Sequence, residues 1–259
     1  MKLVFVTALL SVSVLLAACS RPVPPLFKNF RNLDVDGKVT FLGTLLDYQK
    51  KPFEQKENQD HLFAILQNEK EDIRVRNEAL NVLSVQESRD LSEAYLKYYN
   101  DPSCPKDLKT NIALELSEKV ARNPKILQLF LAKINDTREP DGARMNMALA
   151  LGDAGLKSSP EILQALAKAY ENPGNYPSLR INAITSLAKF YDQELARKTL
   201  EKSLKDPKQE LRLALASFLT HASNKAFLPW LRILAADADA GVAAQGQKGV
   251  AWIEKLSHP

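Results

Sequence analysis

Apolar residues along most of the chain recur with the spacing of amphipathic helices. One pattern occurs six times: an apolar residue, a basic residue, two variable positions, two apolar or small residues, two variable positions and an apolar residue. Apolar positions three and four residues apart lie on one face of a helix, so the pattern predicts one helix in each copy. The copies are 75–83, 108–116, 143–151, 179–187, 211–219 and 242–250, the last having Ala243 at the basic position.

A second amphipathic run precedes most of these copies and ends at Asn or Asp shortly before a proline. Asn172 is followed by Pro173, and Asp206 is followed by Pro207. Because proline cannot continue a helix and Asn and Asp favour turns, each run is predicted to be a helix that stops there. The repeating unit is therefore a helix, a turn and a second helix. Successive basic positions are 31 to 36 residues apart, a period typical of solenoids.

The second helix of this unit resembles that of a HEAT repeat. Residues 72–83 read Asp-Ile-Arg-Val-Arg-Asn-Glu-Ala-Leu-Asn-Val-Leu, and residues 148–155 resemble the Leu-Gly ending common in bacterial members. Tetratricopeptide repeats have a similar period, but their Trp, Gly-Tyr and Pro positions are missing. The resemblance covers residues 58–256. It implies an all-α fold, a right-handed superhelix of helical hairpins (an α-solenoid), and leaves the function open.

The first eighteen residues predict a secretory signal peptide. Lys2 precedes an uncharged, mostly apolar run that ends in small residues, and this run is too short for a permanent membrane helix. Residues 16–19, Leu-Ala-Ala-Cys, resemble a bacterial lipobox, which implies lipidation of Cys19 and cleavage before it. Several acyl chains would provide a stable anchor. Cleavage by an ordinary signal peptidase is the alternative. Ser20 favours the outer membrane, facing the periplasm, over the inner membrane.

Four regions follow from these signals. Residues 1–18 are the signal peptide, 19–30 the lipidated Cys and a Pro-rich tether, 31–57 an N-terminal capping region, and 58–259 the HEAT-like repeats with a C-terminal cap. Within the capping region, residues 39–48 predict a helix, although residues 34–39 also permit a short hairpin. At the other end, Trp252, Ile253 and Leu256 are expected to cover the last open face of the core, as solenoid ends require.

Composition and charge exclude several classes of protein. The chain is 45% hydrophobic and 25% charged, with a net charge of +4, which is ordinary for a globular protein and too dilute for a nucleic-acid binder. Once Cys19 is lipidated, Cys104 is the one remaining thiol, so no intramolecular disulfide forms. The three histidines lie in separate segments without zinc-ligand spacing, and no phosphate loop or nucleophile elbow is present. No metal, cofactor or catalytic residue is therefore predicted.

A basic residue occupies the same position in five of the second helices. On a helical wheel this position lies about 37° from the centre of the apolar stripe, so the side chains must run between repeats. We expect their charged ends to reach acidic turn residues such as Asp72 or Asp141, forming a structural ladder. A phosphate-binding row is the alternative. The ladder residues are Arg76, Lys109, Arg144, Arg180 and Arg212.

The face opposite the apolar stripe carries apolar residues in two neighbouring central repeats. Second helices line the concave side of a HEAT-like solenoid, so Leu114 and Leu149 are expected to point into a groove. Such a groove would bind an apolar segment of an unknown protein partner. The alternative is that the central helices are buried more widely than the wheel allows. The predicted partner-binding residues are Leu114, Leu149 and Met145, bordered by Asn111, Asn146 and Asn182.

The sequence thus predicts a non-enzymatic, membrane-anchored lipoprotein that acts as a protein–protein interaction scaffold or adaptor in the bacterial cell envelope. One alternative is a lyase or isomerase, because some HEAT-like bacterial proteins resemble bilin lyases. Another alternative is binding of a small molecule or a cell-wall glycan.

Overall fold

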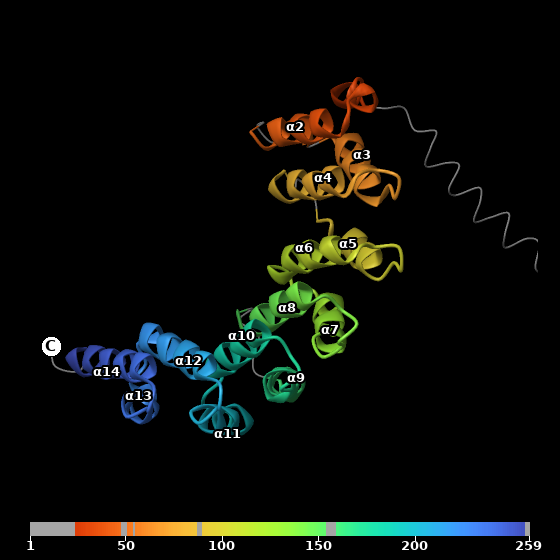
Figure 1. The fold of residues 1–259 in the computed structure, drawn as a ribbon. Helices are drawn as coiled ribbons and strands as arrows, with labels where there is room; N and C mark the ends of the chain where they lie inside the picture. Colours follow the sequence, from red (N-terminus) through yellow and green to blue (C-terminus); the bar gives the residue numbers. More distant parts are fainter. Residues whose placement is uncertain (1–23, 48–50, 54, 87–89, 154–158, 257–259) are drawn as a thin grey trace, which may run out of the picture. The chain divides into compact units, whose positions relative to one another are not determined.

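The computed structural model describes residues 24–47, 51–53, 55–86, 90–153 and 159–256. The chain divides into two compact units, the first ending at Leu91 and the second beginning at Ser92. Every regular element in these ranges is a helix, so the described fold is all-α, as predicted (Figure 1). The expected signal peptide and Cys19 lie outside the described residues.

The described residues of the first unit form three α-helices and three short 3-10 helices. Both α2 and α3 pack against α4. Asp34 caps α2, because its carboxylate accepts a hydrogen bond from the amide of Gly37 at 2.8 Å. The elements are η1 (Pro25–Phe27), η2 (Phe30–Asn32), α2 (Val35–Leu46), η3 (Lys51–Phe53), α3 (Lys56–Gln67) and α4 (Ile73–Val85). The expected helix in the capping region is therefore present, but it begins at Val35.

The predicted tether extends too far into the chain. Phe27 and Phe30, which we assigned to the Pro-rich tether, are buried in the first unit. The ring of Phe27 lies 4.6 Å from the imidazole of His61 and packs edge-on against Phe41. The burial of these two aromatic rings outweighs the local preference of the Pro-rich segment for an extended chain. Folded structure thus begins no later than Pro25.

The second unit is a series of helical hairpins. Its first helices are α5 (Ser92–Tyr99), α7 (Pro124–Lys133), α9 (Pro160–Glu171), α11 (Glu194–Ser203) and α13 (Leu228–Ala235). Its second helices are α6 (Lys106–Ser117), α8 (Asp141–Asp153), α10 (Pro177–Ala188), α12 (Gln209–Ala222) and α14 (Ala240–Lys255). A short helix, η4 (Lys225–Phe227), precedes α13. The hairpins agree with the predicted helix–turn–helix unit, so within this unit the chain forms an α-solenoid.

Proline and short polar residues start several of these helices. Pro124, Pro160 and Pro177 occupy the first turn, where proline's fixed backbone angle suits a helix. Asn123 and Ser159 cap the helices that follow them by accepting backbone hydrogen bonds. Prolines in this unit therefore mark the starts of helices, in addition to the helix ends that the sequence predicted.

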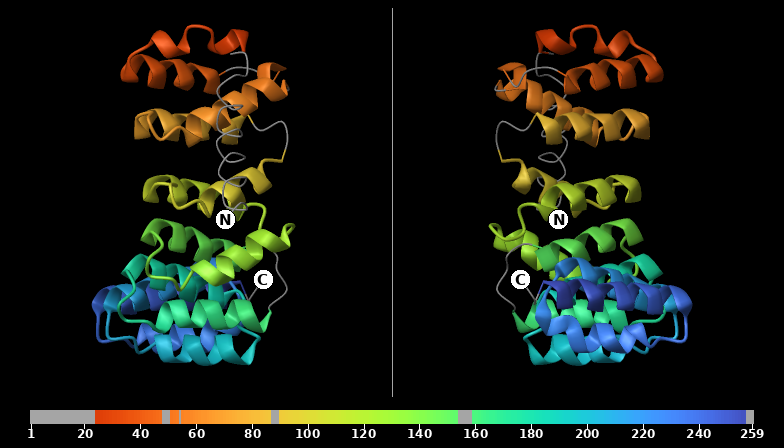
Figure 2. Two further views of the ribbon diagram at one scale, coloured as in Figure 1. Left: turned by 90° about the vertical axis from the view of Figure 1, so that its right-hand side faces the viewer. Right: turned by 90° about the vertical axis from the view of Figure 1, so that its left-hand side faces the viewer.

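The second helices form an inner row. Each of α8, α10, α12 and α14 packs against the second helix before it, while α7, α9, α11 and α13 lie on the outer side of the row (Figure 1). Figure 2 shows from two sides that α6 (yellow-green) and α8 (green) lie in successive layers. This packing places the exposed side of the second helices on the concave face.

The C-terminal end is less covered than we predicted. Ile253 is buried, but the exposed fraction is 48% for Trp252 and 50% for Leu256. These residues lie four residues apart, on a side of α14 that no later helix of the described chain covers. The indole ring of Trp252 is therefore accessible to solvent.

Candidate functional site

A pocket of about 500 Å³ lies between the end of α12 and one side of α14 and is open to solvent. Thr220, His221 and Ser223 line it from α12 and the residue that ends that helix. Lys248, Ala251, Trp252 and Lys255 line it from α14. These four residues are spaced i, i+3, i+4 and i+7, so they form a single stripe along the helix. The lining surface is mostly carbon.

Glycines on the opposite side of α14 bring this helix close to its neighbours. A Cβ atom on Gly246 would collide with the backbone of α13 at Leu234 and Ala235, and one on Gly249 would collide with the hydroxyl of Thr220. Close approach is possible only because glycine lacks a side chain. The two glycines therefore set the position of the α14 stripe relative to the end of α12.

The indole of Trp252 is held in place by a hydrogen bond. Its Nε1–H donates to the Oγ of Ser223 at 2.9 Å. Ser223 ends α12 with a φ of 51° and is the one described non-glycine residue with a positive φ. This left-handed conformation is unusual for a serine, and such strain is found more often at functional sites. The strained residue thus orients the largest aromatic surface of the pocket.

His221 presents a defined tautomer to the pocket. Its Nδ1 lies 2.7 Å from the carbonyl oxygen of Ser217. A carbonyl oxygen only accepts hydrogen bonds, so Nδ1 carries a proton, and in the neutral ring Nε2 has the lone pair. His221 is therefore able to accept a hydrogen bond from a bound molecule.

The two lysines give the pocket a positive charge. Neither Lys248 nor Lys255 forms an ion pair with a described carboxylate. The one acidic residue of α14, Glu254, instead accepts a hydrogen bond from Arg232 at 3.0 Å. The pocket therefore combines an aromatic wall, two ammonium groups and a hydrogen-bond acceptor.

The predicted partner-binding residues are placed on the inner row. Leu114 and Leu149 are exposed, with exposed fractions of 55% and 39%, and Met145 and Asn111 are half-buried. Two of the asparagines connect neighbouring second helices: the side-chain amide of Asn146 donates to the carbonyl of Thr110 at 3.1 Å, and that of Asn182 donates to the carbonyl of Met145 at 3.3 Å. These two amides therefore bond to the solenoid's own backbone, where we expected them to face a peptide.

The predicted ladder residues join the two helices of a hairpin. The Nε–H groups of Arg76, Arg144 and Arg180 each donate to a carbonyl ten residues earlier, at the end of the preceding first helix, at 2.7 to 2.9 Å. Arg180 also bonds to Asp206, and Arg212 bonds to Asp237, both in the turn of the following hairpin. We expected partners among acidic turn residues such as Asp72 or Asp141, and Arg144 pairs with Asp141 at 3.2 Å. Asp72 instead bonds to Arg74.

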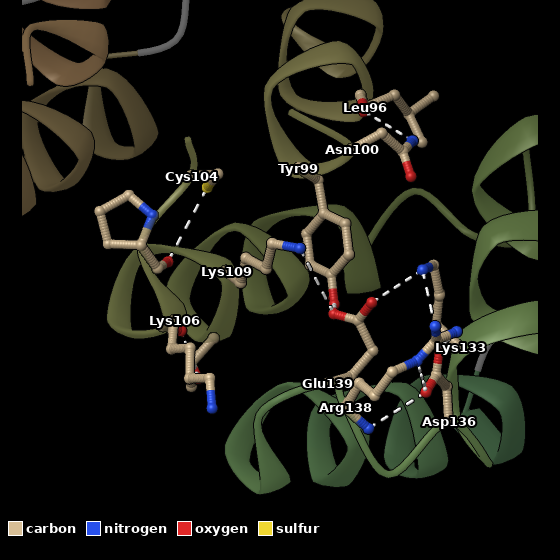
Figure 3. A network of polar contacts seen from close by, with 12 residues as sticks. Leu96, Tyr99, Asn100, Cys104, Lys106, Lys109, Lys133, Asp136, Arg138 and Glu139 are labelled. Carbon is tan, nitrogen blue, oxygen red and sulfur yellow. Dashed lines mark hydrogen bonds and ion pairs between the residues drawn. The ribbon is translucent and has the colours of Figure 1, made fainter. Parts of the chain in front are cut away.

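Lys109, the remaining ladder residue, belongs to a network around the buried Glu139 (Figure 3). Its ammonium lies 3.7 Å from the Glu139 carboxylate, which also contacts Lys133 at 2.8 Å and accepts a hydrogen bond from the hydroxyl of Tyr99 at 3.0 Å. Burial alone would raise the pKa of Glu139, but the hydrogen bonds from Lys133 and Tyr99 and the charge of Lys109 lower it overall. Burial and the neighbouring carboxylate raise the pKa of Tyr99. The network links α5 and α6 to α7 and to the turn before α8, so it joins two neighbouring hairpins.

Sequence reasoning missed most of the pocket. We treated His221 as an isolated histidine and Trp252 as a cap residue, and we did not single out Ser223 or Lys255. Two features of the sequence indicate this pocket. The pocket residues of α14 share one side of a helix, and Lys248 occupies the same position of its repeat as Leu114 and Leu149 do in theirs. Cys104 is buried, and its thiol lies 3.8 Å from the carbonyl oxygen of Pro105.

Two other kinds of feature are absent from the described residues. No cluster of His, Cys, Asp or Glu in them is suited to a metal ion. None of their helices is both long and apolar enough to cross a membrane.

Comparison with known proteins gives a likeness in structure but none in sequence. No protein family and no curated protein matches the sequence of this chain. Among solved structures, the chain is similar to human deoxyhypusine hydroxylase in complex with glycerol, with 18% identity and a TM-score of 0.40. The match covers 89% of this chain and 83% of the hydroxylase chain. At this identity and TM-score, the likeness assigns no reaction to the chain.

This finding nevertheless contradicts our prediction of a non-enzymatic scaffold. We inferred that role from the repeats and from the lack of catalytic motifs, whereas the solved structure to which the chain is similar is that of an enzyme. The physical reason is that helical repeats specify an architecture on which binding or catalytic sites arise without a recognisable motif. We therefore withdraw the prediction that the chain is not an enzyme.

Proposed function

We propose that this chain is a HEAT-type α-solenoid that binds a small organic molecule in the pocket between α12 and α14. The observation that carries the proposal is the pocket itself. Its volume of about 500 Å³ lies within the range of ligand sites, roughly 300 to 1,000 Å³. A mostly apolar lining with a few converging polar groups is also typical of such sites. Here those groups are the imidazole of His221, the hydroxyl of Ser223 and two ammonium groups.

Filling the pocket tests this proposal. Ala251 lines the pocket and is exposed, so Ala251→Phe places a ring in the cavity without disturbing the core. Ala244→Phe, on an exposed part of the same helix outside the pocket, is the matched control. Binding is followed by the indole N–H signal of Trp252 in nitrogen-15 NMR spectra during a screen of small aromatic and aliphatic fragments, and Trp252→Phe assigns that signal.

We expect fragments to shift the Trp252 signal in the wild type and in Ala244→Phe, and to leave Ala251→Phe unaffected. A screen in which no fragment shifts the signal would refute the proposal. So would equal shifts in the wild type and in Ala251→Phe, because binding would then lie outside the cavity.

The proposal further includes a lipid anchor in the bacterial cell envelope. The lipobox-like residues 16–19 and the apolar run before them support it, and Ser20 supports the outer membrane facing the periplasm. Incorporation of labelled palmitate by cells that produce the full chain tests the anchor. We expect Cys19→Ala to abolish labelling and Cys104→Ala to retain it. Labelling that persists in Cys19→Ala would refute the anchor and leave the pocket proposal unaffected.

A further inference from the structure

The two lysines of the pocket flank the indole along α14. Lys248 and Lys255 are separated by seven residues, which corresponds to about 10 Å along a helix axis. Trp252 lies between them, four residues after one and three before the other. A flat ring placed on the indole therefore has an ammonium group near each of its two ends.

No negative side chain in the described part of the pocket neutralises these charges. The residues facing the cavity from α12 and from Ser223 are a threonine, a histidine and a serine, and α14 contributes no carboxylate. Glu254 is paired with Arg232. Both α12 and α14 end here, and the carbonyl groups at helix C-termini carry partial negative charge. An anion would thus be held by the lysines and not by the backbone.

The indole favours a planar apolar partner. Trp252 is half-exposed, and its ring is fixed by the hydrogen bond to Ser223. Stacking of two aromatic rings is worth about two- to tenfold in affinity beyond the area that it buries. A ring stacked on Trp252 also covers apolar surface that water otherwise contacts.

We propose that the pocket is specific for a planar, ring-bearing dianion, with its ring on Trp252 and its two acidic groups at Lys248 and Lys255. This inference rests on the proposed function, since it names the ligand class of the same pocket. Two charges are favoured over one because the two lysines are about 10 Å apart along the helix axis, so two separated acidic groups match their spacing better than a single one. Each exposed ion pair contributes up to about fivefold in affinity.

Three probes with one ring system separate the contributions: naphthalene-2,6-disulfonate, naphthalene-2-sulfonate and the neutral 2-naphthol. Dissociation constants are measured at pH 7 from the Trp252 indole signal of the full chain. We expect the disulfonate to bind tightest, the monosulfonate up to about fivefold more weakly, and 2-naphthol more weakly by a similar further factor. At about 1 M salt, where the screening length falls to about 3 Å, the three affinities should converge.

Lysine variants locate the charges. Lys248→Met and Lys255→Met keep most of the side-chain volume and remove the ammonium group, so each should lower the affinity for the disulfonate to that for the monosulfonate. Binding of 2-naphthol should not change. Lys225→Met, at an exposed lysine outside the pocket, is the control and should bind all three probes as the wild type does.

The outcomes distinguish the two proposals. If the three probes bind equally and Ala251→Phe abolishes their binding, the pocket is a ligand site but the dianion inference is wrong. If the disulfonate is preferred but Lys225→Met weakens it as much as the two pocket variants do, the preference reflects overall charge, and the inference is again wrong. If no probe binds, the dianion inference fails, while the fragment screen still decides the proposed function.

Discussion

Replacing Arg180 by methionine removes one side chain from a buried ionic network of the second unit. The guanidinium donates to the carbonyl of Tyr170 at 2.7 Å and to the carboxylate of Asp206 at 2.6 Å, and it lies 5.0 Å from the ring centre of Tyr170. Hydrogen bonds to charged groups contribute about 1.5 to 3 kcal/mol each. We therefore expect Arg180→Met to lower the free energy of unfolding by about 3 to 5 kcal/mol, the range for breaking a buried pair.

Most of this loss comes from the carboxylate left behind. Asp206 is buried, which alone would raise its pKa, but the hydrogen bonds from the Tyr170 hydroxyl and the Lys208 amide, together with Arg180, hold the pKa below its ordinary value. A carboxylate whose pKa is lower in the folded than in the unfolded protein stabilises the fold at pH values above the unfolded-state pKa, which is about 3.9 for aspartate. This stabilisation is lost as the pH falls through the folded-state pKa. The difference between the wild type and Arg180→Met should therefore be largest near neutral pH and shrink in acid.

Urea denaturation followed by circular dichroism measures the overall change, and hydrogen exchange locates it. Because each hairpin of a solenoid contacts only its neighbours, faster exchange should be concentrated in α9–α12. Arg232→Met is the matched control, since Arg232 forms a similar ion pair with Glu254 that is exposed to solvent. Its cost should be at most about 1 kcal/mol.

Two results would refute this reasoning. The first is a loss below about 1 kcal/mol in Arg180→Met, similar to that of the control, which would mean that the network is solvated. The second concerns the double variant Arg180→Met/Asp206→Asn. We expect it to regain part of the stability lost in Arg180→Met, because the uncompensated charge is gone. If the double variant is no more stable than Arg180→Met, the stranded carboxylate is not the cause.

Three further predictions follow from individual residues. Leu149→Glu should change the melting temperature little because Leu149 is exposed, whereas Leu151→Ala, at a fully buried leucine, should cost about 2 to 5 kcal/mol in thermal unfolding; equal effects would contradict the assigned faces. Burial, reinforced by the positive charge of Arg31, lowers the pKa of His61, so the first unit should lose stability as the pH falls below about 6.5. An NMR titration of His61 that gives an unshifted pKa would disprove this. Finally, Gly246→Ala should destabilise the fold by about 1 to 3 kcal/mol, because its methyl group meets the backbone of α13; urea unfolding identical to wild type would show that α14 moves without cost.

Local signals in the sequence were sufficient to predict the repeating unit. Apolar spacing marked the second helices, and turn residues with proline marked the ends of the first helices, because both signals depend on neighbours within a few residues. The outward direction of Leu114 and Leu149 also followed from helical geometry alone. The sequence of a single helix therefore predicts which of its faces is exposed, provided that the helix packs against its neighbours on one side only.

Contacts between distant segments were decided by the tertiary structure. Arg180 and Arg212 find their acidic partners in the next hairpin, 26 and 25 residues later, although the sequence offered nearer candidates. Phe27 is buried against residues of α2 and α3, which a Pro-rich segment gives no local reason to expect. Packing of large aromatic rings outweighs weak local preferences.

The pocket also depends partly on local sequence and partly on tertiary packing. The sequence determined that Lys248, Trp252 and Lys255 share one side of a helix. Whether that side meets the end of another helix depends on how closely α14 approaches α12 and α13. The glycines of α14 set this distance through their contacts with residues of those two helices. The site exists because of this packing, and packing over such sequence separations follows from the complementary shapes of whole helices and not from the periodicity of any one segment.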